Sequence, residues 1–304
     1  MKNPPKEFKL LASVTDFTRH FGFPAPSNPL LAVIDLEHTR HLTPPAGAAL
    51  RQLYIITLKK NLKGQLHYGR HSYDFSEGVL AFYAPGQLCE ASPSVDVSEL
   101  SGWMLVFHPD LLHKSPLGKK ITGYGFFSYQ VHEALHLSPR EEGMLDVLME
   151  SIRREYEQPI DAFSQDVLVS QLEVLLNYAN RFYHRQFLTR RTPEHDLLSR
   201  FEKLLLTYFA QDGQLPLPTV QYFADALHVS PAYLSDMLRS LTGQNTQQHI
   251  HNRLIDKAKQ LLLSTSLSVN ETAFQLGFDY PHYFSRLFKN KTGLSPAAFR
   301  FSAQ

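Results

Sequence analysis

The chain has 304 residues, of which 43% are hydrophobic and 19% are charged, and its formal net charge is +1. This length fits two domains of about 100 to 200 residues each, and the apolar fraction excludes a disordered chain. The single cysteine, Cys89, excludes an intramolecular disulfide framework and a multi-cysteine metal site. No apolar run of about 18 residues occurs and the first residues lack an apolar stretch, so we expect no membrane span, no secretory signal and a cytoplasmic location.

Short apolar runs rich in β-branched and aromatic residues mark the chain from Leu30 to about His108. They include Leu31–Leu36, Leu53–Leu58, Val79–Tyr83 and Trp103–Phe107. Turn-forming sequences such as Ala84-Pro85-Gly86 separate them. This pattern predicts a β domain, either a small antiparallel barrel or a sandwich.

Past Pro139 the apolar residues recur at intervals of three and four, which predicts two amphipathic helices joined near Pro159. The second of these contains Leu168 to Tyr183. The polar stretch Thr189–Pro193 predicts a short linker after it. We therefore place a domain boundary there, with domains at 1–192 and 193–304.

The C-terminal part contains an internal repeat. Five residues of one copy recur fifty positions later: Pro231, Tyr233, Ser235, Thr242 and Gly243 match Pro281, Tyr283, Ser285, Thr292 and Gly293. Each copy predicts a short helix, a tight turn and a second helix, at Thr219–Leu227 and Ser230–Leu241, then at Val269–Leu276 and Tyr280–Lys291. We expect N-caps at Ser230 and Ser268, and a positive φ at Gly277. The sequence thus predicts a doubled helix-turn-helix.

Between the copies, Thr246–Leu263 lacks proline and glycine and carries one apolar stripe, so it predicts a continuous helix about 27 Å long. Such a helix would hold the two second helices in successive major grooves on one face of B-DNA, whose turns repeat every ~34 Å. The alternative is a small helical bundle without a ligand. Both interpretations expect the same core residues, which are Leu234, Leu238, Phe284, Leu287 and Phe288.

The charge is unevenly distributed along the chain. Residues 1–192 hold 20 basic and 20 acidic residues, whereas residues 239–304 hold eight basic and three acidic residues. A solvated lysine-rich face and a phosphate-binding surface both fit this basic excess. The early outward positions of each second helix are the candidate DNA contacts: Ala232, Tyr233, Ser235, Asp236 and Arg239 in the first, and Pro281, His282, Ser285, Arg286 and Lys289 in the second. Asp236 is unfavourable beside a polyanion, unless it accepts from a cytosine amino group.

A long signature runs through the second copy and the helix before it. Its parts are Lys257–Leu262, Ala273 with Leu276–Phe278, Tyr283–Lys289, Thr292–Pro296 and Phe299-Arg300. This signature resembles the AraC/XylS family of bacterial transcription regulators, over Leu204 to Arg300. The resemblance implies a sequence-specific DNA-binding regulator whose base contacts come from Ala232, Ser235 and Asp236 in the first recognition helix and Pro281, His282, Ser285 and Arg286 in the second. Thr272 departs from the family, because a large aliphatic residue is usual there.

The resemblance also implies the fold class and the partners. The fold would be α+β, with an N-terminal cupin-like β-barrel for sensing, a helical dimerisation segment, and an all-α C-terminal domain with two helix-turn-helix motifs. The partners would be double-stranded DNA, a small-molecule effector, a second copy of the chain and RNA polymerase. The helix around Leu168–Tyr183 would form the dimer seam, or its apolar stripe would pack on its own domain.

An effector pocket in the β domain would be mostly apolar, and its candidate lining residues are Tyr54, Tyr68, Tyr83 and Trp103. One rival function is a metal-dependent cupin enzyme fused to a DNA-binding module. However, the interval between His67 and His71, with Glu77 beyond, does not fit a metal cupin, so we predict no metal, no cofactor and no catalytic residues. A second rival is a regulator that responds to a protein partner. An enclosed pocket of at least ~300 Å³ would disfavour that rival.

Overall fold

A computed structural model describes residues 8–43, 45, 47–61, 66–68, 71–73, 78–90, 98–189, 191–211 and 216–302. The chain divides into two compact units, residues 1–186 and 187–304. The predicted boundary at 192/193 falls inside a helix that begins at Arg191. The prediction of a linker at 189–193 is wrong where the structure describes it, because this stretch is helical on both sides of residue 190.

The first unit combines ten short strands with four α-helices and five short 3-10 helices. The strands are β1 (Lys9–Leu11), β2 (Leu31–Asp35), β3 (Ala48–Arg51), β4 (Tyr54–Lys60), β5 (Leu66–Tyr68), β6 (His71–Tyr73), β7 (Val79–Tyr83), β8 (Gln87–Glu90), β9 (Ser101–Phe107) and β10 (Leu135–His136). The helices are α1 (Val14–Phe21), α2 (Pro116–Lys120), α3 (Pro139–Tyr156) and α4 (Ser164–Thr189), with 3-10 helices η1 (Glu37–Thr39), η2 (Pro109–Leu112), η3 (Ile121–Gly123), η4 (Gly125–Ser128) and η5 (Val131–Glu133). These counts refer to the described residues. The end of α4, from Phe187 onward, belongs to the second unit.

Three sheets are formed by the described strands. The largest is antiparallel with the order β10-β7-β4-β9-β2, a second has the order β1-β3-β8, and β5 pairs with β6. The described ladders between strands of residues 30–108 are all antiparallel, as predicted, whereas β1, which precedes this stretch, runs parallel to β3. In the described part of the chain the ladders do not close into a barrel, so the cupin-like barrel remains a prediction.

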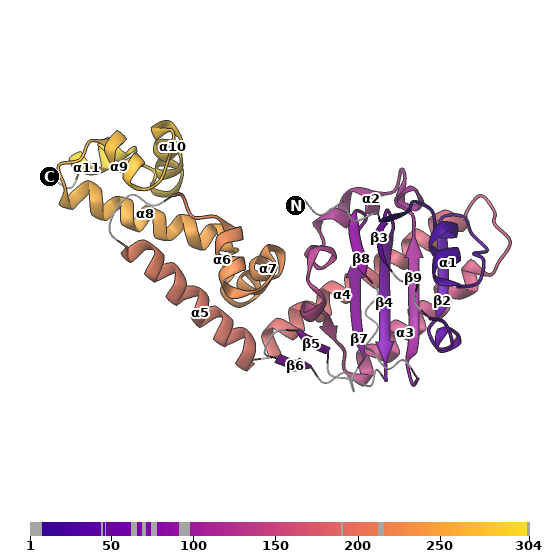
Figure 1. Cartoon of the computed structure of the whole chain (residues 1–304). Helices are drawn as coiled ribbons and strands as arrows, with labels where there is room; N and C mark the ends of the chain where they lie inside the picture. Colours follow the sequence, from indigo (N-terminus) through magenta and orange to yellow (C-terminus); the bar gives the residue numbers. More distant parts are fainter. Residues whose placement is uncertain are drawn as a thin grey trace, which may run out of the picture. The chain divides into compact units, whose positions relative to one another are not determined.

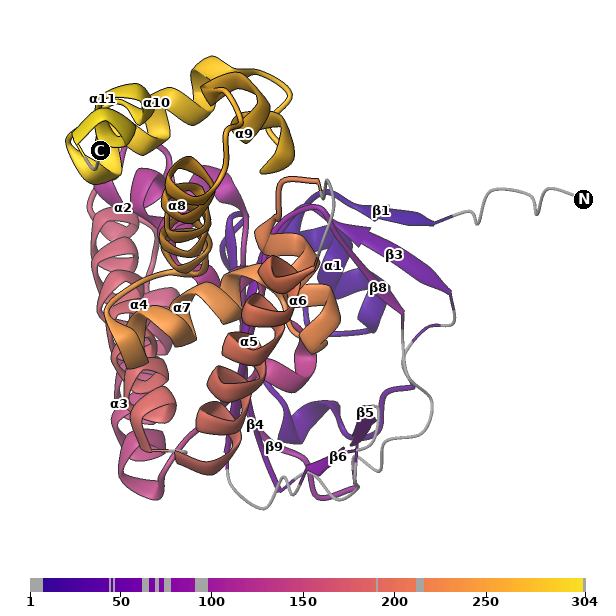
Figure 2. The ribbon, with the colours of Figure 1, turned by 90° about the vertical axis from the view of Figure 1, so that its left-hand side faces the viewer.

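Both faces of the five-stranded sheet are covered (Figure 2). The strand β4 is buried without interruption from Ile55 to Leu58, as expected for a strand covered on two sides. On one face α3 and α4 pack against it, whereas α1 and the sheet β1-β3-β8 lie on the other. Leu11, Val14 and Phe17 are almost fully buried in the core on that second face. In the ladder between β4 and β9, the backbone of Gly102 (φ 107°) approaches the carbonyl of Leu58 so closely that there is no room for a Cβ.

The second unit is helical in its described residues. It contains α5 (Arg191–Ala210), α6 (Val220–Leu227), α7 (Pro231–Thr242), α8 (Thr246–Ser264), α9 (Val269–Gln275), α10 (Pro281–Thr292) and α11 (Pro296–Ser302). The long helix α8 joins the pair α6/α7 at one end to the pair α9/α10 at the other (Figure 1). The predicted helices therefore agree with the observed ones to within about two residues, whereas α5 was not predicted.

Candidate nucleic-acid interface

The α9/α10 pair is shaped by local sequence. Ser268 and Glu271 form a capping box at the start of α9, as predicted. Gly277 has the predicted positive φ of 87°, which only glycine adopts without strain. Pro281 is the first residue of α10, and Gly293 ends that helix in the left-handed conformation. These features fix where each helix begins and ends before any tertiary contact is considered.

The two faces of α10 differ in character. Phe284 and Phe288 are fully buried in a cluster that includes Leu254 and Leu262 of α8. The opposite face carries the predicted contacts. His282, Arg286 and Lys289 are exposed on it, and Pro281 and Ser285 are partly exposed. Since these residues lie three or four positions apart, they form one polar and basic stripe along the helix.

An aromatic cluster, consisting of Tyr280, His282 and Tyr283, lies at the start of α10. The His282 and Tyr283 rings are 4.2 Å apart between centroids, and the Tyr280 ring is 5.8 Å from His282 and 6.0 Å from Tyr283. Tyr280 is 60% exposed and Tyr283 is 49% exposed. The Arg286 guanidinium lies 5.5 Å from the centroid of the Tyr283 ring. Neither Tyr280 nor Tyr283 is among the candidate DNA contacts predicted from the sequence, although Tyr283 and Arg286 have the i, i+3 spacing that brings side chains together on a helix.

The α6/α7 pair has the same plan with one substitution. Thr219 and Ser230 cap its two helices. At the turn, His228 has φ 60° in the place that Gly277 takes in the other pair. The amide of Val229 donates to the carbonyl of Ala224, as the amide of Phe278 does to Ala273 in the second pair. The turn geometry is therefore repeated with a histidine in the left-handed conformation.

The α7 candidates are less available than those of α10. Tyr233 was predicted to face outward, but it is only 8% exposed and its ring packs edge-on against Phe187 at 5.2 Å, so the predicted outward position is wrong. The hydroxyl of Ser235 shares a 3.0 Å hydrogen bond with that of Thr246, which is completely buried.

The charges of α7 are also paired. Asp236 and Arg239 form an ion pair of 3.4 Å along the helix. Ala232 is partly exposed and offers only a methyl group. The outward surface of α7 is thus nearly neutral, whereas that of α10 is basic.

The helix α8 holds the two pairs in place. Asn245 caps it through a capping box with Gln248, and its apolar residues Ile250, Leu254, Ala258 and Leu262 are buried. Two histidines lie along it: His249 faces the Phe201 ring, and Lys291 lies near His251. Burial lowers the pKa of both imidazoles, and the nearby Lys291 lowers the pKa of His251 further.

The predicted effector residues of the first unit do not gather at one place. Tyr54 stacks on Phe107, and the Trp103 indole N–H donates to Asp146 of α3 at 3.1 Å, so both lie on the face of the sheet that α3 and α4 cover. Tyr83 lies opposite Ile55 in the ladder and therefore points to the other face, where the Arg51 guanidinium lies 4.7 Å from its ring centroid. The prediction of one common lining is wrong for these three residues. The side chain of Tyr68 lies outside the described residues.

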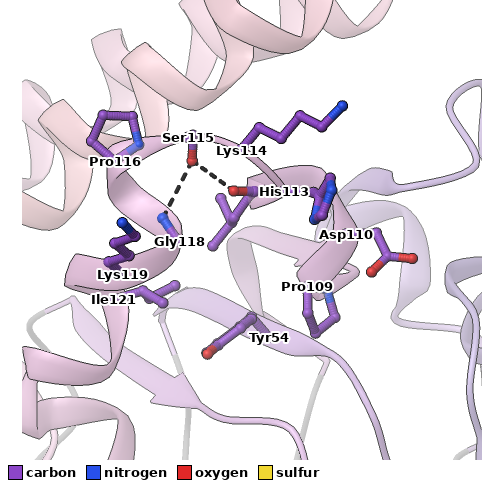
Figure 3. Close-up of a pocket in the computed structure, with 11 residues that line it drawn as sticks. Tyr54, Pro109, Asp110, His113, Lys114, Ser115, Pro116, Gly118, Lys119 and Ile121 are labelled. Atoms are coloured by element: carbon purple, nitrogen blue, oxygen red, sulfur yellow. Dashed lines mark hydrogen bonds between the residues drawn. The ribbon is translucent and has the colours of Figure 1, made fainter.

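A pocket of about 660 Å³ lies beside Tyr54 (Figure 3). Its other lining residues are Pro109, Asp110, Leu112, His113, Lys114, Ser115, Pro116, Gly118, Lys119 and Ile121. The Ser115 hydroxyl donates to the carbonyl of Leu112 at 2.8 Å and accepts from the amide of Gly118 at 3.3 Å, which holds the wall in shape. Burial raises the pKa of Tyr54, so its phenol is neutral and keeps its proton.

The metal and membrane predictions concern other residues. Among the residues that the structure describes, no group of three His, Cys, Asp or Glu side chains is placed to hold a metal ion. The side chains of His67, His71 and Glu77, on which the metal-enzyme alternative depended, lie outside the described residues. No helix in the described ranges is long and apolar enough to cross a membrane.

Comparison with known proteins adds to this geometry. A family model described as a helix-turn-helix domain matches residues 223–301, which begin within α6 and include α7 to α10. The chain is 30% identical over 162 residues to the HTH-type transcriptional regulator YfiF of Bacillus subtilis, covering 51% of this chain and 49% of YfiF. This match and this relative support an AraC/XylS-type transcription regulator, with the similarity concentrated in the C-terminal part of the chain. The helix-turn-helix domain is the part of the chain that carries this similarity.

Two further proteins are similar to parts of the chain. The MmsAB operon regulatory protein of Pseudomonas aeruginosa is 37% identical over 151 residues, which is 45% of this chain and 48% of that protein. The solved C-terminal domain of the response regulator AraT from Geobacillus stearothermophilus is 34% identical, with a TM-score of 0.32, covering 38% of this chain and 88% of that domain. The chain spans about half the length of YfiF and of the MmsAB regulator.

Proposed function

We propose that this chain is a sequence-specific, DNA-binding transcription regulator in which residues 193–304 bind promoter DNA and residues 1–192 sense a signal. The observation that carries the proposal is the stripe on α10, where His282, Arg286 and Lys289 are exposed above buried Phe284 and Phe288. Arginine donates two hydrogen bonds to guanine in the major groove, and lysine suits a phosphate. The matched helix-turn-helix domain and the basic C-terminal segment support the same function, which would be carried out in the cytoplasm.

The two helix pairs would contribute unequally. A double helix-turn-helix needs its two recognition helices about one turn of DNA apart, and α8, with 19 residues, is about 28 Å long. In α7, the Ser235 hydroxyl is bonded and Asp236 is paired with Arg239, so this helix offers little to base edges. We therefore assign base recognition mainly to α10, and a weaker contribution to DNA binding to α7.

The test separates base contacts from phosphate contacts. A duplex is selected by the full chain from a random library, and its affinity is measured at several salt concentrations. Arg286→Ala should cost about 1–3 kcal/mol at one base position, whereas Lys289→Ala should weaken all sequences alike and reduce the salt slope by about one. Arg154→Ala, which removes an exposed arginine of the first unit, is the matched control. Unchanged binding by both α10 variants would exclude this helix from the groove.

The proposed effector is a small molecule that binds the first unit. The pocket beside Tyr54 supports this, because its volume of about 660 Å³ lies within the range for small-molecule sites. Trp103 is the only tryptophan of the sequence and lies opposite Leu58 in the ladder. Leu58, Ile56 and Tyr54 alternate along β4 and share one face of the sheet, so Trp103 fluorescence can report binding beside Tyr54. A compound that changes both Trp103 emission and DNA affinity, and loses both effects in Tyr54→Ala, would support an effector at this pocket. Changes that persist in Tyr54→Ala would place the site elsewhere.

The proposed assembly is a homodimer. The sequence left two alternatives for the apolar stripe of the helix around Leu168–Tyr183, which were a dimer seam and packing on its own domain. Leu168, Leu172, Leu175 and Leu176 of this stripe are at most 3% exposed within a single chain. This burial supports packing of that stripe on its own domain. A different face of the same segment is free for a second copy, and it carries Phe163, Val167 and Val174, which are 71%, 37% and 41% exposed.

Sedimentation of the full chain tests the assembly. Val174→Glu should shift a dimer to a monomer without unfolding it, because Val174 is exposed, and Val147→Glu on α3 is a control of the same chemistry. A dimer that survives Val174→Glu would contradict this seam. Contact with RNA polymerase remains a prediction from the family resemblance.

A further inference from the structure

Tyr233 and Tyr283 occupy equivalent positions fifty residues apart, yet their environments are opposite. Tyr233 is 8% exposed and its ring packs edge-on against Phe187. Tyr283 is 49% exposed, and its ring faces the Arg286 guanidinium at 5.5 Å from the centroid. The repeat therefore keeps the residue type at this position while using the ring in two ways.

The position three residues further on differs in a matching way. Where α10 has Arg286, α7 has Asp236, which pairs with Arg239 at 3.4 Å. A carboxylate gains nothing from the negative face of an aromatic ring, whereas a guanidinium within about 6 Å of a ring centroid is attracted to it. The exposed tyrosine and the arginine thus occur together in one helix, and neither feature is present in the other.

Neighbouring rings hold Tyr283 in position. The His282 ring is 4.2 Å away, and the Tyr280 ring meets Tyr283 edge-on at 6.0 Å with an interplanar angle of 79°. An exposed arginine has a large rotamer entropy, which is lost when it binds a base in one geometry. A ring that restricts Arg286 before binding lowers that cost.

We propose that Tyr283 is a positioning residue: it holds the Arg286 guanidinium in the orientation that recognises guanine, and so makes α10 the specificity-determining helix. This inference rests on the proposed function, in which α10 enters the major groove. The positioning of Arg286 is assigned to the face of the Tyr283 ring, and the phenol hydroxyl is not required for it.

The experiment uses the full chain and the duplex that it selects from a random library. The guanine contacted by Arg286 is found by replacing each guanine with 7-deazaguanine, which lacks the N7 acceptor that a bidentate arginine uses. Tyr283→Leu should reduce discrimination between guanine and 7-deazaguanine at that position by about 2- to 5-fold, which corresponds to a cation–π contact at an exposed site. Tyr283→Phe keeps the ring and should restore wild-type discrimination.

A double-mutant cycle separates positioning from a general structural role. In an Arg286→Ala background, Tyr283→Leu should have no further effect on discrimination, because the ring acts through that arginine. Tyr222→Leu, which removes a tyrosine of α6 with 43% exposure, is the matched control.

The outcomes that would overturn the inference are distinct. If Tyr283→Phe behaves like Tyr283→Leu, the hydroxyl carries the effect and the positioning role is wrong. If Tyr283→Leu weakens all duplexes equally in both backgrounds, its role is structural or a phosphate contact. If Arg286→Ala leaves discrimination unchanged at every guanine, the assignment of α10 as the base-contacting helix fails instead.

Discussion

Arg300 provides the sharpest prediction about the stability of the helix-turn-helix domain. From α11 its Nε donates to the carbonyl of Leu262 at 2.8 Å, and its Nη2 donates to the carbonyl of Leu267 at 2.6 Å. Leu262 lies in the last turn of α8, where helix carbonyls have no intrahelical donor, and a cation there also complements the helix dipole. One side chain thus joins α11 to the end of α8 and to the segment that leads into α9.

The cost of removing Arg300 follows from these two contacts. A hydrogen bond to a charged group contributes about 1.5–3 kcal/mol, and partial exposure of Arg300 lets water replace some of the loss, so we expect Arg300→Ala to destabilise this region by about 2–4 kcal/mol. Amide hydrogen exchange in α9 and α11 of the full chain should then accelerate by about 30- to 900-fold. Arg300→Lys should recover part of the protection, since lysine keeps the charge without the planar fork.

Arg286→Ala is the matched control, because it removes an exposed arginine that carries the same charge. It should change exchange in α9 and α11 by less than about threefold. An acceleration below threefold in Arg300→Ala would refute the reasoning. In that case the two carbonyls would be satisfied equally well by water.

Three further predictions concern the backbone and the histidines. Gly102→Ala should prevent native pairing of β9 with β4, because a Cβ would lie 2.1 Å from the carbonyl oxygen of Leu58; loss of cooperative thermal unfolding in the first unit checks this, and a normal melting curve would contradict it. His228→Gly should stabilise the second unit by about 0.5–1 kcal/mol in urea unfolding, because the left-handed φ of 60° strains every residue except glycine; a loss of stability would show that the imidazole has a role in the turn. Burial lowers the folded-state pKa of His251 below the unfolded value near 6.5, so the unfolded chain takes up the proton first and stability falls as the pH decreases from about 6.5 through the folded pKa. Between pH 7.5 and pH 5.5 the urea midpoint should therefore fall less in His251→Gln than in the wild type. An equal fall in both proteins would assign the effect to other groups.

The helix pairs of the second unit were predictable because their limits are set by local chemistry. A serine before a proline, a capping box and a glycine after the last helical residue act within a few positions of each other. Ser230, Ser268 and Gly277 accordingly have the predicted conformations. The long helix α8 followed from one uninterrupted apolar stripe, and the fifty-residue repeat identified the two copies without any structure.

The candidate contacts were predictable in α10 but only partly in α7. Heptad-like spacing says which residues share a helix face, and for Arg286 and Lys289 that was sufficient. It does not say whether another element covers the face. The Tyr233 ring packs against Phe187 of α4, which is distant in the sequence, and the Ser235 hydroxyl is hydrogen-bonded to Thr246 of α8. Neither partner lies on α7, so the spacing along α7 does not reveal them.

The sequence by itself determined where the helix pairs begin and end, and which family the C-terminal part resembles, because caps, turns and signatures are local. Only the tertiary structure decided which side chains are exposed. In the folded chain the apolar stripe of α4 is buried, and Tyr54 and Tyr83 lie on opposite faces of one sheet. Tyr283 is exposed, whereas the equivalent Tyr233 is buried. Exposure depends on which surfaces meet, and surfaces meet through residues that are far apart in the chain, so no local pattern specifies it.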